Sequence, residues 1–92
     1  MQAHQLKIHQ DFWNDLVEGK KTAEIRRNDR DYKVGDILLI KAFPVDAEGY
    51  QHETDSEVRI ITHITEGGQY GIEKGYCLLS MAKPNQVEVR TL

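Results

Sequence analysis

The sequence lacks the features that mark membrane proteins, disulfide-stabilised proteins and metal-binding proteins. Its 92 residues contain one cysteine, Cys77, which excludes an internal disulfide; the apolar run around it predicts a buried, inert thiol. No apolar run approaches the roughly 20 residues that a helix needs to cross a bilayer. The N-terminal residues contain no apolar core of the kind that marks secretion. We therefore expect a cytoplasmic protein that does not contact a membrane.

Recognisable cofactor motifs are also missing. The four histidines are scattered and form no metal-binding pattern. The glycines form no phosphate-binding loop. The sequence therefore predicts neither a bound metal nor a cofactor.

Length and composition indicate one small domain. A chain of 92 residues has room for a single hydrophobic core. The hydrophobic fraction of 39% and the charged fraction of 29% are typical of a soluble globular protein. We expect residues 1–92 to fold as one domain and to act as a monomer.

Charge is distributed unevenly along the chain. The net charge of −3 argues against bulk nucleic-acid binding. Residues 19–33 nevertheless hold six bases and three acids, whereas residues 42–73 hold one base and seven acids. Such polarity can direct an anionic ligand towards the first segment. On composition alone, solvated surface charge is the simpler explanation.

Apolar spacing predicts one helix, over residues 10–18. Phe12, Trp13, Leu16 and Val17 form an apolar stripe on such a helix. Gly19 is well placed to end it, because glycine readily adopts the left-handed conformation found after helices.

Alternating or continuous apolar residues predict five or six short strands, and a mobile loop or hairpin tip between the middle ones. In residues 57–65 the alternation places Val58, Ile60, Thr62 and Ile64 on one face. Five or six strands and one early helix favour a mostly-β (α+β) fold, a small barrel with the helix across one opening. The expected strands cover residues 5–8, 22–27, 37–42, 57–65, 76–81 and 86–90, and the loop covers residues 44–55.

The strand over residues 22–27 carries the charged segment. Side chains alternate across a strand, so Ala23 and Ile25 share one face while Glu24 and Arg26 share the other. We expect Ala23 and Ile25 to face the core. Glu24 and Arg26 would then stand side by side on the open face.

Several polar side chains of this segment are candidates for ligand binding. Arginine is the usual choice for bidentate recognition of phosphate or carboxylate, which suits Arg26 and Arg30. Lys21 would supply a point charge, or act as a base or nucleophile. Asn28 lies in the polar loop that follows the strand. A lattice of ion pairs around Glu24 explains the same residues equally well.

The run G-x-K-x-x-E-x-R over residues 19–26 resembles the signature of the ASCH domain superfamily. The following N-D-R-D and the late G-Y-C-L-L-S are similar to a branch of small bacterial and phage proteins of unknown function. The likeness covers most of the chain, from about His4 to Met81. It implies a PUA-like β-barrel, closed or nearly closed, that binds RNA or a nucleotide in a cleft beside the motif strand.

This resemblance favours a binding module for RNA, a nucleotide or a nucleoside. Arg26 and Arg30 would take phosphate oxygens, and Glu24 would accept from an exocyclic amine, as carboxylates do with cytosine N4. Tyr32 or Tyr76 would stack on a base. Partial burial of each tyrosine, with its hydroxyl at the surface, is the other interpretation.

The resemblance also raises an alternative, a small amidohydrolase acting on an acylated nucleoside such as N4-acetylcytidine. Lys21 matches the catalytic lysine of such an enzyme by its place after the motif glycine. Glu24 stands where that enzyme has a threonine. The remaining carboxylate would come from Glu66 or Glu73, in the loop before the strand over residues 76–81. A third possibility is a protein partner that binds the acidic residues 46–57.

Overall fold

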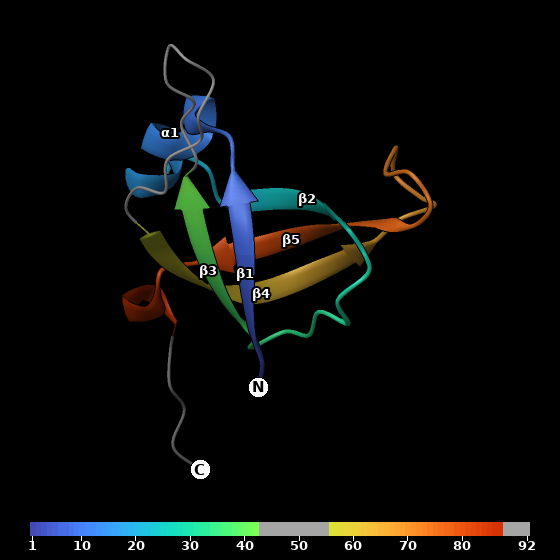
Figure 1. Cartoon of the computed structure of the whole chain (residues 1–92). Coiled ribbons are helices and arrows are strands. Elements are labelled where there is room, and N and C mark those ends of the chain that lie inside the picture. The colour runs from blue at the N-terminus through green and yellow to red at the C-terminus, as the bar shows by residue number, and fades with distance from the viewer. Residues whose placement is uncertain (43–55, 88–92) are drawn as a thin grey trace.

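A curled five-stranded sheet forms the body of the protein (Figure 1). The computed structural model describes residues 1–42 and 56–87. The strand order is β1-β3-β4-β5-β2; β1 pairs with β3 in parallel, and the other neighbours are antiparallel. The strands are β1 (Ala3–Ile8), β2 (Ala23–Arg27), β3 (Ile37–Ala42), β4 (Ser56–Glu66) and β5 (Tyr76–Ala82).

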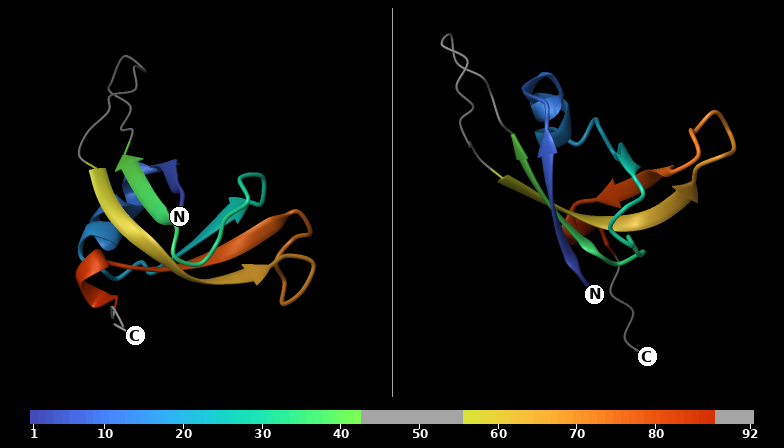
Figure 2. Two further views of the ribbon diagram at one scale, coloured as in Figure 1. Left: turned by 90° about the horizontal axis from the view of Figure 1, so that it is seen from below. Right: turned by 45° about the vertical axis from the view of Figure 1, so that its right-hand side comes forward.

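The sheet is a half-barrel (Figure 2). Strands β1 and β2 are its two edges, and no ladder joins them within the described residues. The mostly-β class and five of the predicted strands are therefore confirmed, whereas a closed barrel is not what the structure shows. A sixth strand over residues 86–90 does not begin as predicted, because Gln86 ends a 3₁₀ turn, η2 (Pro84–Gln86). The rest of that strand, and the expected loop over residues 44–55, lie outside the described residues.

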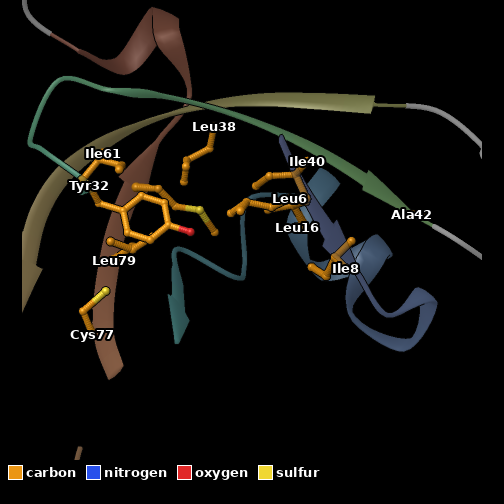
Figure 3. Packing of buried hydrophobic residues seen from close by; sticks show 11 residues of the cluster. Leu6, Ile8, Leu16, Tyr32, Leu38, Ile40, Ala42, Ile61, Cys77 and Leu79 are labelled. Carbon is orange, nitrogen blue, oxygen red and sulfur yellow. The ribbon is translucent and has the colours of Figure 1, made fainter. Parts of the chain in front are cut away.

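The predicted helix is present as a 3₁₀ turn, η1 (Gln10–Phe12), followed by one short helix, α1 (Trp13–Val17). Leu16 is the buried residue of α1 and points towards Leu6 and Ile40 in the core (Figure 3). Gly19 follows with a φ of 78°, which confirms that glycine ends this segment. No helix within the described residues is long and apolar enough to span a bilayer.

The core lies on the inner, concave side of the curled sheet. It contains alternate residues of β1, β3 and β5, because successive side chains of a strand point to opposite faces. Tyr32 from the loop between β2 and β3 also packs there (Figure 3). The cluster comprises Leu6, Ile8, Leu16, Tyr32, Leu38, Ile40, Ala42, Ile61, Cys77, Leu79 and Met81.

The four residues predicted to share one face of strand β4 do not all lie on the same face. The buried residues are Arg59 and Ile61, whereas Val58 and Thr62 are exposed. The pairing with β5 shifts between Ile61 and His63, which marks a β-bulge. A bulge inserts one extra residue and changes the facing of those beyond it. Ile64 consequently packs against the core, although it was predicted on the same face as Val58.

Strand β2 is also turned the opposite way from the prediction. In the antiparallel pairing, Glu24 lies opposite Leu79 and Arg26 opposite Cys77, and both β5 residues are fully buried. Directly opposed residues share a face, so Glu24 and Arg26 point inward. Ile25 points outward and is 58% exposed. The prediction that Ala23 and Ile25 face the core was therefore wrong.

Candidate functional site

Three charged side chains of the motif segment meet on the inner face. Glu24 and Arg26 come from β2, and Lys21 comes from the turn that precedes this strand. Lys21 Nζ lies 3.4 Å from Glu24 Oε2, and Arg26 Nη2 lies 3.7 Å from Glu24 Oε1. The side chains of Glu24 and Arg26 are only 15% and 24% exposed. The structure thus brings together the three residues on which both functional hypotheses depend.

Two polar atoms of this cluster are buried without a hydrogen-bond partner among the described residues. They are Glu24 Oε2, an acceptor, and Arg26 Nε, a donor. Lys21 Nζ is near Glu24 Oε2 but donates its hydrogen bond to the carbonyl of Ala23, at 2.7 Å. A buried polar atom left unpaired costs about 1–3 kcal/mol. The inner face therefore carries an acceptor, Glu24 Oε2, that has the ion pair with Lys21 but no hydrogen bond, and a donor, Arg26 Nε, that has no hydrogen-bond partner among the described residues.

Two arginines join the open edges of the half-barrel. Arg26 Nη2 donates to the carbonyl of Lys7 at 2.5 Å, and Arg30 Nη1 donates to the carbonyl of Gln5 at 2.6 Å. Both acceptors belong to β1, which is an edge strand. Each guanidinium has five N–H donors, so these bonds use only part of its capacity. Arg26 and Arg30 hold β1 opposite β2 in place of a strand ladder.

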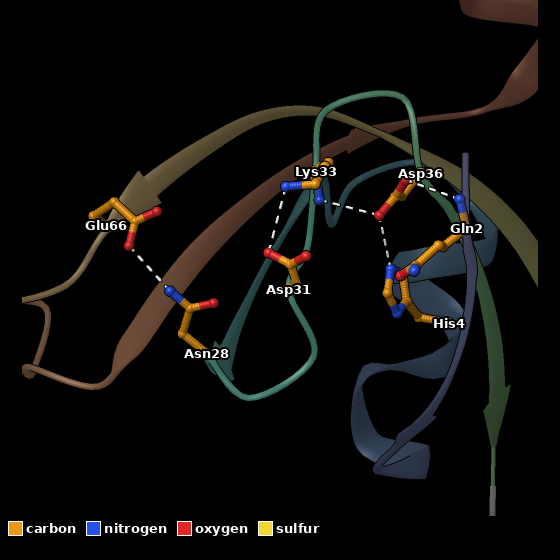
Figure 4. A network of polar contacts seen from close by, with 7 residues as sticks. All are labelled: Gln2, His4, Asn28, Asp31, Lys33, Asp36 and Glu66. Atoms are coloured by element: carbon orange, nitrogen blue, oxygen red, sulfur yellow. Dashed lines mark hydrogen bonds and ion pairs between the residues drawn. The ribbon is translucent and has the colours of Figure 1, made fainter.

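Asn28 connects the loop after β2 to the hairpin between β4 and β5. Its side chain donates to Glu66 Oε2 at 3.0 Å, and its backbone N–H donates to the carbonyl of Gly75 at 2.9 Å (Figure 4). Glu66 pairs with Cys77, which pairs with Arg26. Glu66, which was predicted to lie in the loop, is the last residue of β4 and extends the polar row of the inner face.

The two tyrosines proposed to stack on a base are not exposed on this face. Tyr32 is 8% exposed, and its ring lies 4.7 Å from that of His4, measured between centroids. Burial raises the pKa of the Tyr32 hydroxyl, against the opposing influence of the positive charges of Arg30 and Arg26. Tyr76 lies opposite Arg27 and so faces the outer side of the sheet. Core packing accounts for Tyr32, and strand alternation separates Tyr76 from the site.

Sequence reasoning missed a buried polar pair that shapes the site. Asp36 Oδ2 lies 2.8 Å from His4 Nε2 and accepts from the backbone N–H of Lys33, while Oδ1 accepts from Gln2 (Figure 4). The hydrogen bond from His4, followed by that from Gln2, lowers the pKa of Asp36 to about 2. Asp36 thereby ties β1 to the end of the loop that carries Arg30 and Tyr32. The only signal in the sequence was the turn at residues 34–36.

Cys77 has the buried environment that the sequence predicts. Cys77 is fully buried, and burial, reinforced by the negative charges of Glu66 and Asp29, raises the pKa of its thiol. A raised pKa keeps the thiol protonated and unreactive. Among residues 1–42 and 56–87, no group of three or more potential ligands is placed to hold a metal ion.

The fold and the site define a small, mostly-β domain with a polar cluster on the inner face of a curled sheet. The chain belongs to the family described as "Domain of unknown function (DUF3850)", which it matches over residues 3–81. It is also similar to an uncharacterized 12.9 kDa protein in the GpA 3′ region of Escherichia phage P2. The two are 43% identical over 37 residues, which span 40% of this chain and only 34% of that relative.

Proposed function

We propose that this protein binds RNA or a nucleotide, and that the inner face beside β2 holds the edge of a base. The observation that carries this proposal is that Glu24 Oε2, although ion-paired with Lys21, accepts no hydrogen bond, and that Arg26 Nε on the same face donates none within the described residues. A ligand that offers a donor to the carboxylate and an acceptor to the guanidinium would satisfy both atoms at once.

The edge of a nucleobase has this donor-and-acceptor pattern. Cytosine carries its N4 amino group beside the N3 acceptor, and carboxylates accept hydrogen bonds from cytosine N4. A bare phosphate offers only acceptors and would meet the negative charge of Glu24. The base edge therefore belongs at Glu24 and Arg26, and phosphate oxygens suit the remaining donors of Arg26 and Arg30.

As part of the same proposal, this protein belongs to the ASCH superfamily, which has PUA-like barrels. This membership is supported by a curled, mostly-β sheet and by the inward facing of the G-x-K-x-x-E-x-R strand. A ligand beside this strand would lie where two arginines already span the gap between β2 and β1.

Binding of cytidine 5′-monophosphate is expected to depend on Arg26 and Glu24. By calorimetry, Arg26→Ala should weaken binding about 5- to 150-fold, since a good base contact contributes about 1–3 kcal/mol. Glu24→Gln should reduce the preference for this ligand over ribose 5-phosphate, which lacks the base.

Arg27→Ala is the matched control, because Arg27 has the same charge on the same strand but is exposed on the outer face. It should change affinity less than 2-fold. Thermal unfolding of each variant separates lost binding from lost folding. Equal affinity for ribose 5-phosphate and cytidine 5′-monophosphate, or full binding by a folded Arg26→Ala, would show that no base is held here.

The amidohydrolase alternative is favoured by one observation, the closeness of Lys21 and Glu24. The same geometry counts against it, because Lys21 donates to the carbonyl of Ala23 and faces a carboxylate. An ammonium held by these groups has no lone pair for attack on an amide.

We therefore expect no deacetylation of N4-acetylcytidine above the buffer rate, followed by absorbance. If the original protein and the Lys20→Ala variant turn over this substrate and the Lys21→Ala variant does not, the hydrolase function would be established instead. Lys20 is the matched control, because its exposed side chain pairs with Glu18.

A further inference from the structure

Tyr70 stands at the tip of the β4–β5 hairpin in a conformation that tyrosine seldom adopts. Its φ is 53°, and that of Gly71 is 78°. Ile72 N–H donates to the carbonyl of Gln69 at 2.9 Å, which closes a two-residue turn. Two consecutive positive φ angles define a type I′ turn, where asparagine or aspartate is preferred at the first position. The side chain of Tyr70 is nevertheless 85% exposed, so burial does not explain the choice of residue.

The backbone around Tyr70 is firmly held. A Cβ atom at Gly67 would lie 2.2 Å from the carbonyl oxygen of Glu73 and 2.4 Å from that of Tyr76, so two segments of the hairpin touch there. Gly68 N–H donates to the carbonyl of Ile72 at 2.7 Å. The ring of Tyr70 is therefore presented from a braced turn, and binding it would cost little ordering of the backbone.

The hairpin is bonded to the proposed site. Strands β4 and β5 end level with the end of β2, and the chain that joins them extends beyond it as the hairpin loop (Figure 1). Asn28 bonds both sides of its base, at Glu66 and Gly75. Tyr70 follows Glu66 by four residues, which is no more than about 14 Å of extended chain. A short single strand with one base at Arg26 can therefore extend towards the hairpin tip.

We propose that Tyr70 is a stacking platform for a second base of a single-stranded RNA whose first base occupies the Glu24–Arg26 position. Because this role rests on the proposed function, it specifies an oligonucleotide rather than a mononucleotide as ligand. Stacking on an exposed aromatic ring needs no particular base. Within two residues of Tyr70 lie Gly68, Gln69, Gly71 and the partly buried Ile72; one apolar side chain does not make an apolar patch of the kind that protein interfaces bury.

The test compares hexacytidylate with cytidine 5′-monophosphate at one salt concentration, by calorimetry. Tyr70→Asn should weaken hexacytidylate binding about 5- to 150-fold, the range measured for base–aromatic stacking, and change mononucleotide binding less than 2-fold. Tyr70→Phe keeps the ring and should bind like the original protein. Tyr70→Asn should also raise the melting temperature by a few degrees, because asparagine suits the turn.

Hexacytidylate binding that Tyr70→Asn leaves unchanged would overturn the role of Tyr70 while the site at Arg26 stands. Equal losses in Tyr70→Phe and Tyr70→Asn would also overturn it. If the original protein binds neither ligand, the proposed function itself fails, and this inference fails with it.

Discussion

Replacing Arg59 with alanine is expected to lower the free energy of unfolding by about 3 kcal/mol. Arg59 is buried, and its guanidinium joins two parts of the fold. Nη1 pairs with Glu57 Oε2 at 2.8 Å, and Nη2 donates to the carbonyl of Leu16 at 2.6 Å. Carbonyls in the last turn of a helix have no partner within the helix. Removal of Arg59 would leave the Glu57 carboxylate without this partner, and the Leu16 carbonyl with only the hydrogen bond from the backbone N–H of Gly19, at 3.1 Å.

Urea unfolding followed by the fluorescence of Trp13, the single tryptophan, would measure this loss. Trp13 is the first residue of α1 and packs against the core, so its emission reports the contact in question. Arg27→Ala removes the same charge from an exposed position and should change stability by less than about 0.5 kcal/mol. A loss below about 1 kcal/mol in Arg59→Ala would mean that the buried guanidinium does not anchor α1.

Asp36→Asn is expected to cost about 2 kcal/mol at neutral pH and to remove an acid-dependent part of the stability. The carboxylate accepts from Gln2, Lys33 and His4. An asparagine would turn an N–H₂ group towards some of these donors, leaving buried groups unpaired.

The direction of the pH dependence follows from the lowered pKa. Asp36 has a pKa of about 2 in the folded protein against 3.8 for the ordinary group. A carboxyl with a depressed folded pKa stabilises the protein fully above its unfolded pKa. This contribution, about 2 kcal/mol, is lost as the pH falls from about 4 towards 2.

Urea unfolding at pH 6 and pH 2.5 would measure both effects. The difference in stability between the original protein and Asp36→Asn should shrink at the lower pH. Asp31→Asn is the control, because Asp31 lies in the same loop with an exposed side chain and a φ of 49°, a conformation that asparagine tolerates. A difference between the original protein and Asp36→Asn that stays constant with pH would contradict the assigned pKa.

Local patterns predicted the parts of the fold that depend on neighbours in sequence. The apolar run at Ile37–Ala42 and that at Tyr76–Ala82 are strands, and residues 34–36 form the expected turn into β3. The helix before Gly19 is present because its apolar spacing suits one buried face. Simple alternation cannot reveal the extra residue at the β4 bulge, so Ile64 was wrongly predicted to share a face with Val58.

The sequence predicted which charged residues of β2 and the preceding turn form the candidate site, but not that they face the inside of the sheet. Lys21, Glu24 and Arg26 do lie together, as their charges and spacing indicated. Tyr32 was predicted to be available for stacking on a base, but its ring is buried against that of His4. Its burial depends on how the loop after β2 crosses the inner face. The pair formed by His4 and Asp36 joins residues 32 positions apart, a separation at which a single sequence carries no contact signal.

The sequence by itself determined which residues of the Gly19–Tyr32 segment share a face, because the period of a strand is a local property of the backbone. It also predicted that the segment at residues 76–81, which pairs with this one, is a strand. Only the tertiary structure decided which face lies inside. Cross-strand pairing with Leu79 and Cys77 turns Glu24 and Arg26 inward and leaves Ile25 exposed. That choice depends on how the whole sheet curls, and it leaves the donor and acceptor of the proposed site buried on its inner face.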